Sequence, residues 1–547
     1  MSAIEPANPV HMSTAPGTRW STVNFAEAIQ GVQKPLGWAM WSLSMETSVR
    51  MSFGAMGVLA RSEVPVPDSA EDRISGIFYG RAAGNVDTLC GLGDRMPGSS
   101  GAAIEEKMFG KEPAPDAPSG KPLAARRRYP VVAVRMPRAL RAAATQIPVL
   151  RREYREWWQR AVLDAPPTDL PGAQALYSEA ADRFIRVGVH HATASLVGFG
   201  LLDQLTALAV AAGQPTALAA ELATGYGAME ETELLEDLWS ASRDALTLDE
   251  LVRRHGYHGP DEGDLSNSSW REDRRPLESL IASYARSEMT NPREREATQR
   301  ERRRSAEERV LAGLPAYKRG GARLTMKLAS VFIPKREVGK AAFLHTLDAA
   351  RCAAKSGGAL LAEQGLIDDP ADVFFLTDTE FLAPAGASLQ AVVTERKERH
   401  ERYRALVLPP EWTGPPVPLD EPADAGDDAS PAGDGAVAVK EAVRELRGIG
   451  VVGDAVTGRA RVIHDPDEAA LEPGDILVCV TTDPSWTPLF MLADALVIDT
   501  GGQMSHGAIV ARELGVTCVI NTGTGTRDIP DLATITVDGS TGLVTIG

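Results

Sequence analysis

Cysteine is scarce in this sequence, and the four cysteines present show no paired spacing. They stand at Cys90, Cys352, Cys479 and Cys518. A disulfide framework or a thiolate zinc site would need cysteines at close, regular intervals. The sequence therefore indicates neither, and we expect a protein of the reducing cytoplasm.

Positive charge is also in deficit, with 57 Lys and Arg against 74 Asp and Glu and a net charge of -17. This balance argues against a nucleic-acid partner, which a basic surface would attract. The N-terminus, MSAIEPANPVHMSTAPG, has neither a basic start nor an apolar core, and no later stretch reaches the length of a membrane span. We therefore expect no membrane partner.

The chain divides at one clear break in composition. Its 547 residues predict roughly two to four domains. Residues 413–440 combine proline, glycine, alanine and acidic residues, which is typical of a flexible linker. We predict an α/β multidomain protein, with a mainly helical N-terminal substrate domain at 1–412 and a small α/β domain at 441–547.

Apolar residues at helical spacing predict helices over most of the N-terminal domain. The arginine-rich stretch 292–309 carries opposite charges at helical spacing, so we expect it to be a solvated helix face. Residues 70–125 show few periodic runs and predict an irregular lobe or an active-site covering. The expected helices are 149–163, 171–213, 217–255, 276–312 and 337–366.

The C-terminal domain instead shows short apolar strands. They are expected at 476–480, 495–499 and 517–521, followed by a hairpin around Asp538 and Gly539.

His506 lies in the run VIDTGGQMSHGAIVARELGVTCVI, between two of these strands. Gly501 and Gly502 permit a tight turn, and Ser505 is placed to cap a helix that begins at the histidine. A neutral imidazole is a nucleophile near pH 7, and N–H groups at a helix start favour anions. Arg512, on the same helix, is a candidate partner for phosphate. The pattern predicts a phosphoryl carrier, although Ser-His as a simple helix cap is an alternative interpretation.

The stretch from Gly448 to Gly547 resembles the phosphohistidine swivelling domain of enzymes related to phosphoenolpyruvate synthase and pyruvate phosphate dikinase. The matching elements are GIGVVGDAVTGRARVI, PGDILVCVTTDPSWTPLF, DTGGQMSHGAIVARELGV and VDGSTGLVTI. The resemblance implies that His506 accepts a phosphoryl group at one site and carries it to another.

Two parts of that family have no counterpart in this sequence. No ATP-grasp domain precedes the carrier, and no glycine-rich phosphate loop with a following lysine occurs upstream. We therefore expect ATP and Mg²⁺ to bind an ATP-grasp partner subunit, with no cofactor bound to this chain. The phosphoenolpyruvate-binding barrel does not follow Gly547, so pyruvate is not the expected acceptor.

The N-terminal part resembles the substrate-binding region of rifampicin phosphotransferases and of the phosphohistidine subunit of phenylphosphate synthases. The resemblance implies a hydroxyl acceptor, a phenol or another alcohol, and a separate ATP-binding subunit. The similar stretches are 24–43, 76–98, 255–273 and 335–381.

The loop HGYHGPDEGDLSNSSWRED supplies candidate catalytic residues. His258 is a candidate base, Glu262 its orienting acid, and Arg271 a cation that neutralises the incoming phosphoryl group. Where relatives often have Gly-His-Arg-Gly-Pro, this chain has Tyr257 and His258, so the histidine role does not transfer directly. The alternative is that Glu262 and Arg271 only brace the loop. His255 and His258 lack a third ligand, so no metal site is predicted.

Further candidates for substrate binding are Trp38, His190, His191 and His345. His190 and His191 are adjacent on an expected helix, so at most one can face a cavity. For each of these side chains a place in the core is the alternative.

Together these features predict a phosphotransferase subunit that carries a phosphoryl group on His506 from an ATP-binding partner to a hydroxyl acceptor in the N-terminal domain. Two alternatives stay open. The chain could be a phosphohistidine-dependent regulatory module without acceptor chemistry, or a self-contained phosphotransferase with an unrecognised nucleotide site.

Overall fold

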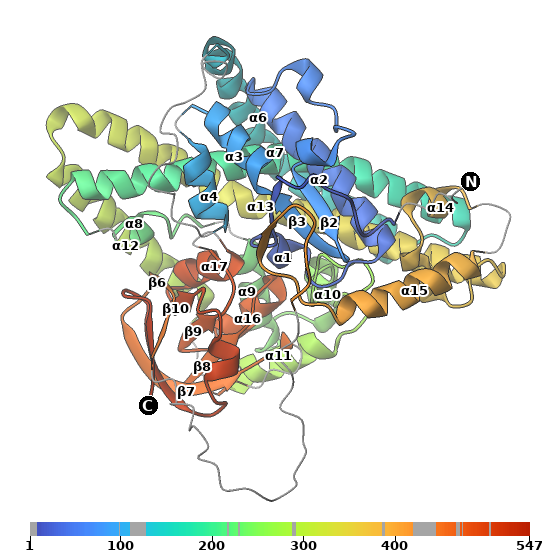
Figure 1. Ribbon diagram of the computed structural model, residues 1–547. Helices are drawn as coiled ribbons and strands as arrows, with labels where there is room; N and C mark the ends of the chain where they lie inside the picture. The colour runs from blue at the N-terminus through green and yellow to red at the C-terminus, as the bar shows by residue number, and fades with distance from the viewer. Residues whose placement is uncertain are drawn as a thin grey trace, which may run out of the picture.

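A computed structural model describes residues 8–97, 99–109, 127–215, 218–227, 230–286, 291–384, 389–419, 445–466, 471–472, 474–502 and 505–547. Within these ranges the chain forms a mainly helical N-terminal region and a C-terminal domain built on a sheet (Figure 1). The predicted fold class is therefore confirmed.

Four long helices form the body of the N-terminal region: α2 (Pro35–Met56), α6 (Tyr129–Trp158), α7 (Leu170–Ala211) and α13 (Ala316–Glu363). Asp169 caps α7 by accepting a hydrogen bond from the backbone N–H of Gly172. Glycines allow these helices to approach closely, because a Cβ at Gly188 would meet Ser48 of α2, and one at Gly339 would meet His191 of α7. The expected helices 149–163 and 337–366 are the ends of the longer α6 and α13.

Helix α7 corrects one expectation. It is long and apolar enough to cross a membrane by length and composition alone, with a mean hydropathy of 1.6 in its best window. No such stretch was expected from the sequence, because Arg186 and Asp203 interrupt the apolar run inside α7. In this structure α7 packs against α2, α6 and α13, and 28% of that window is buried.

A small sheet that the sequence analysis did not predict lies beside the helices. Its strands are ordered β2 (Ser75–Phe78), β3 (Arg81–Asn85), β1 (Arg19–Ser21) and β4 (Glu411–Thr413). The region 70–125 is therefore not irregular where it is described, since β2 and β3 are followed by α3 (Val86–Arg95) and α4 (Gly101–Phe109). Its residues 110–126 lie outside the described residues.

The predicted linker begins on the helical region. Strand β4 pairs with β1, and Val407 forms a bridge with Leu419, so residues 413–419 belong to this region. The rest of the linker, 420–440, lies outside the described residues.

Shorter helices complete the N-terminal region. Along α12 most arginines pair with carboxylates, for example Arg300 with Glu296, which confirms the expected solvated face. The expected helix 217–255 is divided into α8, α9 and α10. The remaining elements are α1 (Phe25–Ala28), η1 (Arg61–Glu63), η2 (Ala70–Asp72), η3 (Gln159–Asp164), α8 (Leu218–Leu222), α9 (Glu230–Ala241), α10 (Leu248–His255), α11 (Arg275–Arg286), α12 (Pro292–Gly313), η4 (Pro370–Phe375), α14 (Asp378–Leu382) and α15 (Gln390–Arg404).

The C-terminal domain is an eight-stranded sheet in the order β5-β12-β11-β7-β8-β9-β10-β6. The four neighbours β7 to β10 are parallel, and β8 to β10 are fully buried, which explains their continuous apolar runs. The three predicted strands and the hairpin are confirmed. The bounds are β5 (Glu445–Arg447), β6 (Ile449–Val452), β7 (Ala455–Val462), β8 (Asp475–Cys479), η6 (Pro484–Trp486), α16 (Thr487–Phe490), β9 (Ala495–Ile498), α17 (His506–Leu514), β10 (Thr517–Ile520), α18 (Gly525–Asp528), β11 (Thr534–Asp538) and β12 (Leu543–Ile546).

The two parts share one hydrophobic core. Leu238, Leu277 and Tyr284 of α9 and α11 belong to the same buried cluster as Phe490 and Val510 of the C-terminal domain. The Tyr284 hydroxyl also donates to the Pro488 carbonyl at 3.0 Å. Figure 1 shows α9 and α11 beside α16 and the sheet. Helices α9 to α11 are therefore the platform on which the C-terminal domain is docked.

A buried carboxylate anchors the loop between α10 and α11. Asp348 of α13 accepts hydrogen bonds from Arg271 at 2.8 Å, Arg351 at 2.8 Å and the Trp158 indole at 2.7 Å. Burial alone would raise the pKa of Asp348, but the two guanidinium groups lower it to about 2. Arg351 also donates to the Glu262 carbonyl at 3.3 Å, so this cluster fixes the loop that carries Glu262.

We expect Arg271→Met to lower the free energy of unfolding by about 3 kcal/mol, because it removes one partner of a buried ion pair. Urea titration followed by circular dichroism measures this change. The matched control is Arg275→Met, which removes an exposed pair with Asp273 and should cost less than about 1 kcal/mol. Equal losses for both variants would contradict the anchoring role of Arg271.

Candidate active site

His506 is the first residue of α17, and the turn before it follows the sequence prediction. The Ser505 hydroxyl caps the helix by accepting a hydrogen bond from the Ala508 N–H at 3.3 Å. Gly501 has a φ of 154°, and Gly515 ends the helix with a φ of 67°, both in the region that favours glycine. A Cβ at Gly507 would lie 2.4 Å from Ile498 of β9, so glycine lets the helix start approach the sheet.

The His506 imidazole is buried and uncharged. Its side chain contacts two threonine hydroxyls, with Nε2 at 3.2 Å from Thr487 Oγ1 and Nδ1 at 3.5 Å from Thr482 Oγ1. Burial lowers the pKa of His506 well below its usual value, and the positive charges of Lys340 and Arg336 lower it further. A neutral imidazole keeps a nitrogen lone pair available, which a phosphoryl carrier requires.

A cavity of about 230 Å³ lies in front of His506, between the C-terminal domain and the helical region. Its apolar wall includes Trp41 of α2, Phe199 of α7 and Phe343 of α13. The Trp41 indole is fixed by donating to the Gly263 carbonyl at 2.7 Å. Concave sites with aromatic walls and a few polar groups are typical of small-molecule binding.

Two cations of α13 line this cavity, and the sequence analysis missed both. Arg336 and Lys340 stand four residues apart, which places them on one face of the helix. Arg336 is paired with Glu337 at 2.5 Å, whereas no ion pair of Lys340 is present among the described residues. The stretch KREVGK could have indicated them, because it places Arg336 and Lys340 at helical spacing. It also begins a segment that resembles the family.

A carboxylate of the α10–α11 loop also faces the cavity. Glu262 lines it, and its Oε1 hydrogen-bonds to Nδ1 of His258, which lies behind it. The Oε2 atom is buried and has no hydrogen-bond partner among the described residues. The predicted pair is therefore present, and Glu262, not His258, lines the cavity.

Asp483 lines the same cavity and was not among the predicted catalytic residues. Burial, and then the negative charge of Glu262, raise the pKa of Asp483 to about 7. Its Oδ2 accepts hydrogen bonds from the Asp261 N–H at 3.0 Å and from Gln30 at 3.4 Å, both in the helical region.

Several other predicted site residues lie elsewhere. Arg271 is held by Asp348 and does not line the cavity, which is the arrangement that the bracing alternative predicts. Trp38 packs in the core, and its neighbour Trp41 takes the place on the cavity wall. His345 is buried between Tyr257 and Trp158, and its Nδ1 donates to the Ala341 carbonyl at 2.7 Å.

Of the adjacent histidines, only His191 lines the cavity, as the helical spacing required. Its Nδ1 donates to the Arg336 carbonyl at 3.0 Å, and burial lowers the pKa of His191 to about 4. His190 points away and is half-buried.

Arg512 lines a separate, smaller cavity with Phe199 and Ile333, away from His506. Burial lowers its pKa to about 10. Among the described residues, no group of three or more His, Cys, Asp or Glu side chains is placed to hold a metal ion.

Comparisons with known proteins agree with this geometry. The family model of the PEP-utilising enzyme mobile domain matches residues 471–542, which include His506. The model of the rifampicin phosphotransferase fourth domain matches residues 197–337, which include α8 to α12 and Arg336.

Curated relatives share segments of the chain. A rifampicin phosphotransferase of Streptomyces sviceus is 32% identical over 331 residues, 58% of this chain and 36% of that protein. A rifampicin phosphotransferase of Bacillus subtilis is 33% identical over 194 residues, 34% of this chain and 20% of that protein. The uncharacterized phosphotransferase YvkC of Bacillus subtilis is 39% identical over 196 residues, 35% of this chain and 22% of that protein.

The chain thus spans 36% or less of the length of each of these relatives. Two of the resemblances drawn from the motifs are confirmed: residues 471–542 match the PEP-utilising mobile domain, and residues 197–337 match the fourth domain of rifampicin phosphotransferase.

Proposed function

We propose that this protein is a phosphotransferase in which His506 carries a phosphoryl group to a hydroxyl acceptor bound in the cavity in front of it. One observation carries the proposal. A buried, neutral histidine faces a cavity that also holds two cations, an unpartnered carboxylate oxygen and an aromatic wall. The relatives named phosphotransferases support the same reaction class.

The transfer step assigns a role to each wall of the cavity. The acceptor hydroxyl attacks phosphorus, the P–N bond to His506 breaks, and a new P–O bond forms. Arg336 and Lys340 stabilise the negative charge on the phosphoryl oxygens. Glu262 Oε2 takes the hydroxyl proton, while His258 orients Glu262 through its hydrogen bond.

The acceptor is a phenol or another alcohol with an apolar body. Trp41, Phe199 and Phe343 offer flat apolar surfaces for a ring, and the polar groups gather at the His506 side. A ring packed against this wall would direct its hydroxyl toward both Glu262 and His506.

An ATP-binding partner with Mg²⁺ at its own nucleotide site would load His506. In the docked arrangement the histidine is only 7% exposed and faces the acceptor cavity. Loading by a nucleotide therefore requires the domain to leave the platform of α9 to α11, with the rest of the predicted linker, 420–440, as the tether.

The carrier role of His506 is tested by loading the full chain chemically with phosphoramidate and adding a panel of phenols and alcohols. We expect an acid-stable phosphoester from the unaltered chain and at least a 100-fold smaller yield from His506→Ala, because the nucleophile is lost. His190→Ala is the control, since His190 lies on α7 outside the cavity.

Full product formation by His506→Ala would remove the carrier role. No phosphoester from any acceptor would favour the regulatory module. Strong labelling of His506 by ATP and the purified chain alone would exclude the need for a partner.

Substitutions of the cavity residues should slow phosphoryl transfer from His506 to the acceptor and leave the phosphorylation of His506 unchanged. We expect Glu262→Gln to slow the transfer step by about 10²–10⁴-fold, because the proton acceptor is lost. His258→Gln should have a smaller effect, since His258 acts through Glu262. Single-turnover measurements on the loaded protein give these rates, and an equal or greater loss in His258→Gln would restore His258 as the base.

The cations should stabilise the transition state. We expect Lys340→Gln to slow transfer by about 10²–10³-fold. Arg323→Gln is the control on the same helix, because Arg323 is exposed and does not line the cavity. Equal rates for Lys340→Gln and the control would contradict the role of Lys340.

A further inference from the structure

Two cavities follow one face of the helix that carries His506. The first turn of α17 presents His506 to the cavity of about 230 Å³, and the following turns present Ile509 and Arg512 to the smaller cavity. Residues three apart lie on one face of a helix, so the two cavities are neighbours along α17. The cavity in front of His506 is called the first compartment, and the smaller one is called the second compartment.

Two helices of the N-terminal region line the compartments in the same order. Along α7 the lining passes from His191 in the first compartment to Leu202 in the second. Along α13, which packs against α7, it passes from Lys340 in the first compartment to Ile333 in the second. The compartments are therefore successive parts of one channel between α7, α13 and α17.

Phe199 of α7 and Arg336 of α13 line both compartments and form the boundary between them. Arg336 is held by its ion pair with Glu337, whereas Phe199 makes no ring contact with another aromatic side chain among the described residues. By contrast, the rings of Trp41 and Phe343 in the first compartment contact each other edge to face, with centroids 6.1 Å apart. The ring of Phe199 is therefore the apolar and least fixed part of the boundary.

Glycines flank Phe199 in the middle of α7, although glycine weakens a helix. A Cβ at Gly198 or at Gly200 would meet no atom of another element within 4 Å, so close packing does not require either glycine. Gly198 is nevertheless buried and lines the second compartment. The missing side chain therefore leaves part of the second compartment open.

The first compartment has the size of one aromatic ring with its substituents. Its volume is about 230 Å³, and a cavity of about 150 Å³ holds benzene. It must also hold the phosphoryl group on His506. The second compartment measures about 30 Å³, roughly the volume of one water molecule. An acceptor with two rings therefore exceeds the first compartment, and the second cannot take a ring while Phe199 separates them.

The second compartment suits an apolar group. Its walls are largely aliphatic, and its charged groups compensate each other. Arg336 is paired with Glu337 at 2.5 Å, while Glu513 lies next to Arg512 and accepts a hydrogen bond from the Gly225 N–H at 3.0 Å. A ring therefore fits this compartment better than an anion does. The aliphatic residues are Leu202, Ala223, Ile333 and Ile509.

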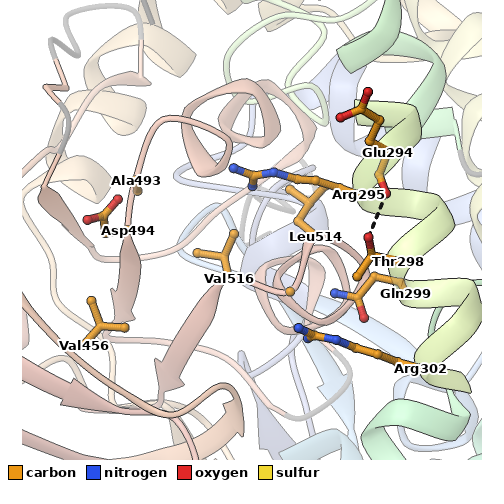
Figure 2. Close-up of a pocket in the computed structure, with 11 residues that line it drawn as sticks. Glu294, Arg295, Thr298, Gln299, Arg302, Val456, Ala493, Asp494, Leu514 and Val516 are labelled. Carbon is orange, nitrogen blue, oxygen red and sulfur yellow. Dashed lines mark hydrogen bonds between the residues drawn. The ribbon is translucent and has the colours of Figure 1, made fainter. Parts of the chain in front are cut away.

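The channel ends near Glu513. Beyond it, Leu514 lines a separate groove of about 490 Å³, which Gln299 of α12 lines from the other side (Figure 2). A Cβ at Gly515 would lie 2.1 Å from Gln299 Nε2, so this side chain packs directly on the end of α17. In the described part of the chain the groove shares no lining residue with either compartment. The space that adjoins the first compartment is therefore the second compartment, and not this larger groove.

We propose that Phe199 is the specificity-determining residue of the acceptor site. Its side chain closes the channel between the two compartments and so limits the acceptor to a phenol or alcohol with a single ring. This inference rests on the proposed function and adds the size of its acceptor. A steric clash rejects the larger molecule even where the smaller one gains no additional contact.

Isothermal titration calorimetry of the full chain with phenol and with ortho-, meta- and para-phenylphenol tests this limit. We expect the unaltered chain to bind phenol at least about tenfold more tightly than any phenylphenol. Phe199→Ala should abolish this preference, so that at least one phenylphenol binds as tightly as phenol, because the two compartments are then joined.

A second substitution tests where the added space lies. In the Phe199→Ala background, Gly198→Leu should fill the second compartment and restore the exclusion of phenylphenols. Phe199→Leu removes less volume and should reduce the preference by less than Phe199→Ala, while circular dichroism checks the fold of each variant. The matched control is Leu208→Ala, which should keep the preference, since Leu208 is a half-buried residue of α7 that lines neither compartment.

Equal binding of phenol and the phenylphenols by the unaltered chain would overturn the inference, and so would binding of none of the four compounds. A preference that persists in both Phe199→Ala and Phe199→Leu would also overturn it. Because binding needs no phosphoryl group on His506, the proposed function can fail separately. Size-selective binding without any phosphoester after addition of phosphoramidate would contradict the transfer reaction and leave the size limit standing.

Discussion

The packing of the C-terminal sheet on helices α9 to α11 is the interaction on which the rest of the structure depends. One face of this sheet, with α16 and α17, shares a continuous apolar core with residues from more than 200 positions earlier in the chain. Removing this surface from water stabilises the docked arrangement. It also places His506 opposite α13 and the α10–α11 loop, which neither part could achieve alone.

The cavity created by this docking brings together opposite charges from different elements. Arg336 and Lys340 come from α13, whereas Glu262 comes from the α10–α11 loop and Asp483 from the loop after β8. The buried cluster of Asp348, Arg271 and Arg351 holds the Glu262 loop at a fixed distance from α13. A phosphoryl group between these walls meets cations, while a hydroxyl beside Glu262 meets a proton acceptor. The same burial lowers the pKa of His506, so the cavity and the low basicity of this imidazole have one physical origin.

The local parts of the site could be predicted from the sequence. Ser505 as the helix cap, the glycine turn before His506 and the buried strands around it depend on residues within one or two turns of each other. The features that differ from the sequence prediction depend on which side chains the fold brings next to one another. Arg271 and Arg336 both lie in stretches that resemble the family. Arg271 pairs with Asp348 in the interior, and this partner is not evident from the sequence. Likewise, the pair of His258 and Glu262 was evident from spacing, but its orientation toward the cavity was not. The small sheet was missed because its strands are three to five residues long and because β1 pairs with β4, which is remote in sequence.

The sequence by itself determined the helix start at His506, the secondary structure around it and the division into a helical region and a sheet domain. These features follow from turn chemistry and hydrophobic period, which act over short stretches of chain. Only the tertiary structure decided which cations and carboxylates face His506, and which carboxylates cross the boundary between the parts. Charge compensation and burial depend on neighbours that are remote in sequence, so the same residue types can serve as braces or as reacting groups according to where the fold places them.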